Sequence, residues 1–301
     1  MIIVSYYNER KVIQQETRMS RILNTFFIRS ITNIPNKYNI NDALERALIT
    51  ELNRPVSRIK ISNHVYDVLT LGIMDADESD YRVYAAKDKE EEYRDIALIE
   101  YLIAVLFWSS GKNIMRDVSN RFYATYTVDE IAKMTVHQVQ QRLLNIYNDS
   151  FAHRTGNVAR TLVNDIYNYA VIQSYIETGT NYFQFQAVID NRTSDICRML
   201  NGSIFPASEA QHYRPPLHYR CRSRLIALQG NTVRNTGMLY ENRNFTTLYD
   251  ANMNPYTSNS ITPTVINQEL QRMNTFRQQW DLPDDLLFED YSYVRGILYG
   301  I

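Results

Sequence analysis

Both cysteines of the chain, Cys197 and Cys221, occur in the same part of the sequence as His218. The H-x-x-C spacing of His218 and Cys221 allows both side chains to reach one metal ion, and Cys197 adds a second sulfur ligand. Two thiolates and an imidazole are ligands that zinc prefers, and His212 or Asp190 could supply a fourth. These residues are therefore candidates for a structural zinc site, which would add much stability to a small β unit.

Two other states of the cysteines are compatible with the sequence. The thiols can be reduced and buried in a core, with His218 hydrogen-bonded near the surface. A disulfide is the third state, but the N-terminal segment MIIVSYYNERKVIQQ does not have the pattern of a signal peptide or a membrane anchor. We therefore expect a reducing cytoplasm, which disfavours a structural disulfide. The apolar run over residues 96–108 contains Glu100 and is too short to span a bilayer, so we expect no membrane contact.

The elements that must position these residues change in type near residue 182. Before this point apolar side chains recur at helical spacing, and residues 157–179 are predicted to form a helix that leads into the site. Thr127 and Glu130 form a capping-box pattern, which predicts the start of another helix. Residues 183–189 alternate between apolar and polar or smaller side chains, as a half-buried strand does. We predict a predominantly α-helical α+β fold: an N-terminal helical region, a small β unit over residues 182–228, and an extended C-terminal arm.

The residues around the two cysteines also form two sequence patterns. The first is D-x-R-T-x-x-x-C, the second is P-P-x-H-x-x-C-R, and a turn glycine lies between them. Together they resemble the head-morphogenesis (Mu F-like) domain of phage minor head proteins, over about residues 155–228. The pair Arg160-Thr161 is similar to an Arg-Thr pair on the lead-in helix of that family. The matching positions are Asp190, Arg192, Thr193, Cys197, Gly202, Pro215, Pro216, His218, Cys221 and Arg222.

The resemblance implies a structural and assembly protein of a tailed-phage head. Such a protein would associate with the portal vertex or the capsid interior and contribute to head morphogenesis, DNA packaging or genome delivery. The implied partners are portal or capsid proteins, with several copies per particle, assembled in the host bacterial cytoplasm and located in the virion. We divide the chain into a helical region (residues 1–125), the head-morphogenesis domain with its lead-in helices (126–228) and an arm with one short helix (229–301).

An excess of arginine follows the first pattern. Between Arg192 and Arg243 the chain contains eight arginines and three acidic residues. Guanidinium groups bind phosphates well, so this region is a candidate contact for packaged DNA. A solvated face with ion pairs inside the protein would explain the same excess, and the net charge of −1 argues against indiscriminate nucleic-acid binding by the whole chain. The candidate nucleic-acid contacts are Arg214, Arg220, Arg222, Arg224 and Arg234.

Enzymatic activity has little support in the sequence. There is no P-loop, no H-E-x-x-H pattern, no nucleophile elbow and no glycine-rich dinucleotide turn. Asp190 and Arg192 fit a structural role better than a catalytic one, because an acidic residue at a strand end can cap a turn or pair with Arg220, Arg222 or Arg224. We therefore expect a binding protein. The alternatives are a DNA-binding internal protein ejected with the genome and a metal-dependent effector enzyme.

Overall fold

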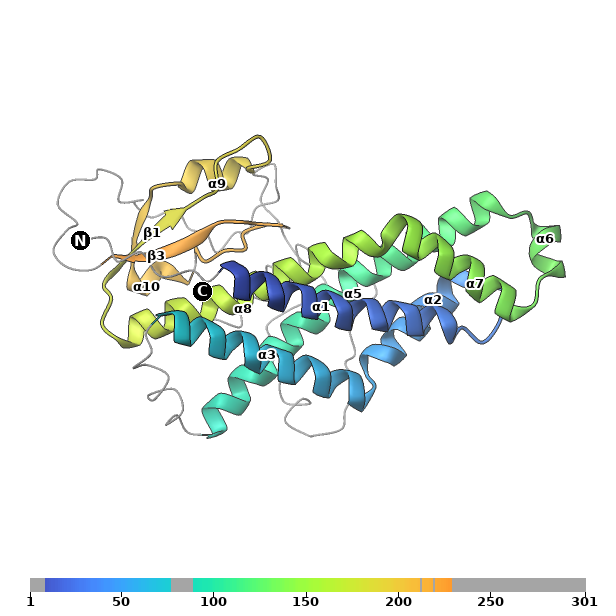
Figure 1. Ribbon diagram of the computed structural model, residues 1–301, viewed down its shortest axis with the longest axis horizontal. Helices are drawn as coiled ribbons and strands as arrows, with labels where there is room; N and C mark the ends of the chain where they lie inside the picture. The colour runs from blue at the N-terminus through green and yellow to red at the C-terminus, as the bar shows by residue number, and fades with distance from the viewer. Residues whose placement is uncertain (1–8, 77–88, 212, 219, 229–301) are drawn as a thin grey trace.

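The computed structural model of the chain describes residues 9–76, 89–211, 213–218 and 220–228 (Figure 1). The predicted C-terminal arm, residues 229–301, lies outside the described residues, as do His212 and Arg234. Within the described part, long helices run along the long axis of the molecule. A small sheet lies at one end of these helices, and the short helix α6 (Val128–Lys133) lies at the other (Figure 1).

The described elements form two groups, a helical bundle and a β unit. The bundle comprises α1 (Glu9–Thr32), α2 (Ile40–Leu52), α3 (Pro55–Ala76), α5 (Lys89–Thr125), α6, α7 (Val136–Ile146), a π-helical turn (Tyr147–Phe151) and α8 (Ala152–Glu177). The β unit comprises β1 (Tyr182–Gln186), α9 (Asp195–Leu200), β2 (Ile204–Pro206), α10 (Ala207–Ala210) and β3 (Arg224–Leu228), with their connecting loops. This order confirms the predicted fold class, a predominantly helical α+β fold.

The predicted helix start at Thr127 is confirmed. The Thr127 hydroxyl accepts from the backbone N–H of Glu130, and the Glu130 carboxylate accepts from the N–H of Thr127 at 2.7 Å. This helix, α6, ends at Lys133. A second capping box at Thr135 and Gln138 starts α7, because these side chains satisfy the N–H groups that a new helix leaves open.

Helix α8 is the central element of the bundle. It packs against α1 and α3, and its apolar residues Leu162, Val163 and Ile166 are almost completely buried. The predicted stop at Gly179 is confirmed, since this glycine follows the helix with φ of 87°. Helices from both sides of residue 125 thus contribute to one core, and the predicted domain boundaries stay predictions. Among the helices of the described residues, none is long and apolar enough to cross a membrane.

The sheet has three antiparallel strands in the order β2-β1-β3. Phe183 in the central strand pairs with Phe205 of β2 on one side and Ala227 of β3 on the other, and all three are buried. The alternation predicted from Phe183 onward therefore gives the expected buried face. The strand ends at Gln186, earlier than predicted, and Ile189 is 53% exposed.

Candidate metal centre

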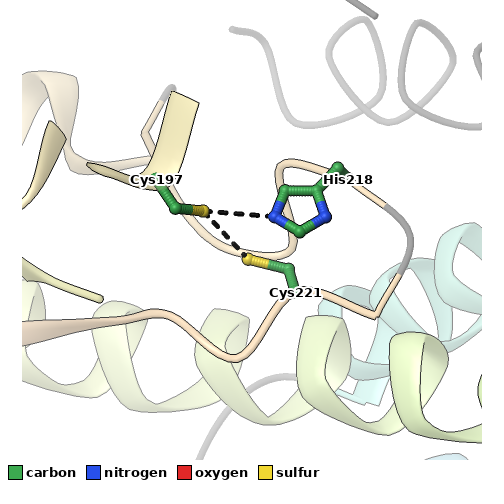
Figure 2. A group of neighbouring side chains, drawn as sticks. All are labelled: Cys197, His218 and Cys221. Carbon is green, nitrogen blue, oxygen red and sulfur yellow. Dashed lines mark hydrogen bonds between the residues drawn. The ribbon is translucent and has the colours of Figure 1, made fainter. Parts of the chain in front are cut away.

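Three potential ligands meet where α9 faces the loop that follows α10 (Figure 2). Cys197 lies in the first turn of α9, and His218 and Cys221 lie in the loop. The Sγ atom of Cys197 is 3.2 Å from Nε2 of His218 and 3.7 Å from Sγ of Cys221, and all three ligand atoms lie within 4.8 Å of one another. Tetrahedral zinc with Zn–S bonds of about 2.3 Å places two sulfurs roughly 3.8 Å apart. The observed arrangement therefore fits a zinc ion without rearrangement of the sulfurs.

The two thiols have opposite pKa shifts. The pKa of Cys197 is raised, because its thiol hydrogen-bonds to the sulfur of Cys221 and because the side chain is buried. Burial alone would raise the pKa of Cys221 as well, but hydrogen bonds from Cys197 and His218 outweigh burial, and this pKa lies well below its ordinary value. Of the two sulfurs, Cys221 is therefore the one that favours the thiolate, the form that binds metals.

Asp190 forms an ion pair beside the three ligands. Its two carboxylate oxygens accept from both terminal nitrogens of Arg222, at 2.8 and 2.6 Å. This hydrogen bonding, together with the N–H of Arg192, holds the pKa of the Asp190 carboxyl far below its usual range. Arg222 is therefore the partner among the three arginines considered from the sequence. Asp190 does not belong to the ligand group of the described residues, because its oxygens are directed at the guanidinium instead.

The comparison with protein families bears on this segment of the chain. Residues 127–226 match the family model described as Phage Mu protein F like protein. This segment, about a third of the chain, is similar to that family. The resemblance inferred from residues 155–228 is thereby confirmed, and the match begins earlier, at α6. The comparison with characterised proteins gave no match, and neither did the comparison with solved structures. At the level of the family, the domain indicates a phage head-morphogenesis protein.

The other motif residues of the Mu F-like domain shape the chain on either side of α9. Gly202 has φ of 86°, a conformation that favours glycine, and its N–H donates to the carbonyl of Phe185 at 2.8 Å. The hydroxyl of Thr193 donates to the carbonyl of Val188 and accepts from the N–H of Asp190. Pro215 and Pro216 are joined by a cis peptide bond. These positions fix backbone geometry around the ligands.

The candidate nucleic-acid contacts have different environments. Arg214 is completely buried, and its guanidinium pairs with Asp165 at 2.8 Å, so the prediction of a surface contact is wrong for this residue. Its partner lies 49 positions earlier in the chain, which no local pattern indicates. Arg222 is held by Asp190, and Arg224 donates to the side chain of Gln186 at 2.6 Å. Arg220 is exposed.

Two contacts that the sequence patterns did not predict attach the ligand-bearing loop to α8. The side-chain amide of Asn164 donates to the carbonyl of Cys221 at 3.1 Å, and the hydroxyl of Thr161 accepts from the N–H of Arg220 at 3.2 Å. Thr161 was singled out by its resemblance to the family's lead-in helix, but that pattern did not predict its contact. Buried polar residues on a helix that otherwise buries apolar side chains are the signal that could have indicated such a docking face.

Proposed function

We propose that the protein is a structural component of a tailed-phage head that acts in head morphogenesis by binding, without catalytic turnover. The observation that carries this proposal is the match of residues 127–226 to the Mu F-like family. The disposition of the motif side chains supports a structural role. Asp190 binds Arg222, and Cys197 faces His218 and Cys221, so these residues contact one another inside the domain.

The proposed location is the portal vertex or the capsid interior, with several copies per particle bound to portal or capsid proteins. There the protein would contribute to head assembly, DNA packaging or genome delivery. Quantitative mass spectrometry of purified proheads and virions tests this location. We expect the protein in both at low copy number relative to the major capsid protein. Its absence from both particles would overturn the proposal.

We further propose that Cys197, His218 and Cys221 bind a structural zinc ion. Two buried thiols and an imidazole at these separations suit zinc, which would link α9 to the loop of His218 and Cys221. The ion would supply a cross-link between two segments of a small unit, in place of a larger apolar core. His212, the other candidate ligand from the sequence, lies outside the described residues.

Metal analysis of the purified full-length chain tests the zinc proposal. We expect close to one equivalent of zinc in the native protein and its loss in Cys221→Ser. The matched control is Ser203→Ala, which changes another buried residue of the β unit outside the ligand group. Zinc far below one equivalent in the native protein, with no change in Cys221→Ser, would leave the alternative of two reduced, buried thiols.

Contact with packaged DNA is the second candidate function, including the variant in which the protein is ejected with the genome. With Arg214 buried and Arg222 and Arg224 engaged with side chains, the exposed Arg220 carries this candidate among the described arginines named from the sequence. Binding of random-sequence duplex DNA at low salt tests it. We expect weak binding that falls steeply with salt and is reduced in Arg220→Gln. Undetectable binding at low salt would exclude this function.

A further inference from the structure

The turn that carries two of the proposed zinc ligands has a backbone conformation that needs support. The N–H of Cys221 donates to the carbonyl of His218 at 3.1 Å, which closes a four-residue turn. Arg220, at the third position, has φ of 62°, a conformation that favours glycine and is unfavourable for a residue with a Cβ atom. This conformation belongs to the turn in which His218 and Cys221 both face Cys197 (Figure 2).

Two side chains of α8 form hydrogen bonds with the backbone of this turn, one at Arg220 and one at Cys221. The hydroxyl of Thr161 donates its own proton to the carbonyl of Asn157 at 2.9 Å, which leaves its oxygen to accept the N–H of Arg220. The amide of Asn164 donates to the carbonyl of Cys221. Thr161 and Asn164 are three positions apart and therefore lie on one face of the helix. The backbone between the last two residues of the turn is thus fixed from outside.

Further hydrogen bonds and an ion pair fix Asn164 and the loop relative to α8. The amide of Asn168 donates to both the carbonyl and the side-chain oxygen of Asn164, at 2.7 and 2.8 Å, and this orients the Asn164 amide toward the turn. The buried pair of Asp165 and Arg214 attaches an earlier part of the same loop to the same helix. Thr161, Asp165 and Asn168 are all nearly fully buried, and burial of such groups is unfavourable unless they are hydrogen-bonded.

We propose that Thr161 and Asn164 are positioning residues for the metal centre, which hold the turn of His218 and Cys221 in its ligand-binding geometry before the ion arrives. This inference rests on the proposed zinc site. In this proposal α8 contributes no ligand but holds the backbone of the two ligands in the loop. Residues that orient metal ligands in this way typically change metal affinity by about 10–100-fold when they are replaced.

The test is titration of metal-free full-length protein with Zn²⁺ in competition with a chromophoric chelator. Visible spectra of the Co²⁺ form report on ligand geometry in the same samples. Thr161→Val keeps the shape of the side chain but removes the acceptor, and Asn164→Asp places a carboxylate oxygen against the carbonyl of Cys221. We expect each variant to bind Zn²⁺ at least about tenfold more weakly and to shift the Co²⁺ spectrum. Thr161→Ser retains the hydroxyl and should restore both properties.

A matched control separates positioning from general stability. Thr155 lies on the same helix, is equally buried, and hydrogen-bonds to the hydroxyl of Tyr147 at 2.8 Å, far in sequence from the turn. Thr155→Val should therefore lower the melting temperature about as much as Thr161→Val, while its Zn²⁺ affinity stays at the native value. If Thr161 only stabilises the fold, Thr161→Val and Thr155→Val will have the same affinity for Zn²⁺.

The outcomes distinguish the two levels of the proposal. If the native protein binds Zn²⁺ and both Thr161→Val and Asn164→Asp bind it equally well, the positioning role is wrong and the zinc site stands. If the native protein binds no Zn²⁺, the zinc site fails and the positioning role fails with it. If Thr161→Val does not fold, Asn164→Asp decides the question, because its side chain is only partly buried.

Discussion

Helix α8 makes different kinds of contact with the rest of the helical bundle and with the loop of the β unit. In the bundle, α8 packs apolar residues such as Leu162 and Ile166 against neighbouring helices. Toward the β unit, the same helix presents Thr161, Asn164 and Asp165, which bind the loop through hydrogen bonds and an ion pair. The difference teaches that one helix can pack by shape and buried area on its apolar face and hold a loop through particular polar partners on another.

This difference has a physical cause in the loop that α8 contacts. The loop between α10 and β3 contains no helix or strand among its described residues, so its backbone groups need partners elsewhere. The loop after α10 obtains them from α8, from Asp190 and from the proposed metal ligands. Loss of one polar partner should therefore damage the β unit more than loss of a similar partner on the surface of the bundle.

The strongest test of the comparison is removal of the acid that pairs with Arg214. Asp165→Ala leaves a completely buried guanidinium without this carboxylate, and breaking a buried pair in this way typically costs about 3–5 kcal/mol. Urea unfolding measures the change in free energy. The control is Asp117→Ala, which breaks the half-exposed pair with Arg154 and should cost at most about 1 kcal/mol. Equal losses in the two variants would contradict the contrast drawn between the regions.

A second prediction concerns the response of the bundle to acid. His64 is buried in α3 and bonds to the carbonyl of Gln15 at 3.1 Å. Burial lowers its pKa from 6.5 to about 4, and Arg18 contributes in the same direction, while Asp67 opposes it. Between these values the unfolded chain binds a proton that the folded chain does not, so stability rises with pH in this window. The contribution of neutral His64 to the free energy of unfolding is complete above pH 6.5. It is lost as pH falls toward 4, by up to about 3 kcal/mol.

Denaturant unfolding of the native protein and His64→Gln at a series of pH values measures this effect. The native protein should lose stability between pH 6.5 and 4, and the variant should lose less over the same interval. His153, at the start of α8, is exposed, and His153→Gln is the control for replacing a histidine by glutamine. Identical pH profiles for the native protein and His64→Gln would show that another group governs the acid response.

Local patterns predicted the parts of the structure that depend on local chemistry. The capping box at Thr127, the strand beginning at Tyr182 and the turn glycine Gly202 each follow from a few neighbouring residues. The sequence also correctly predicted that Cys197, His218 and Cys221 lie close together. The break at Thr135 was missed, although its own capping box with Gln138 was present in the sequence.

Partners that are distant in sequence could not be predicted in the same way. Arg214 looked like one more arginine of a basic region, because its carboxylate partner Asp165 lies on a helix that precedes the sheet. The contact between Asn164 and the carbonyl of Cys221 likewise spans 57 positions. Composition and periodicity report which face of a helix is buried, but they do not report which loop a buried amide will bind.

The smallest predicted effect tests the other half of the comparison, the dependence of the bundle on shape. Gly72 lies where α3 crosses α8, and a Cβ atom there would be 2.7 Å from the Cβ of Ala170 and 2.9 Å from the carbonyl oxygen of Tyr167. Gly72→Ala must therefore push the two helices apart, and we expect a loss of about 1–3 kcal/mol by thermal or urea unfolding.

Gly156→Ala is the matched control for this variant. Gly156 is also helical, and the nearest atom that an added Cβ would meet is the Ser20 hydroxyl at 3.8 Å, an ordinary contact. Because alanine favours a helix over glycine by roughly 1 kcal/mol, Gly156→Ala should stabilise the protein by up to about that amount. The same substitution thus has opposite signs at two helical positions when packing dominates. A stabilising effect at both positions would mean that α3 and α8 do not approach as closely as the bundle requires.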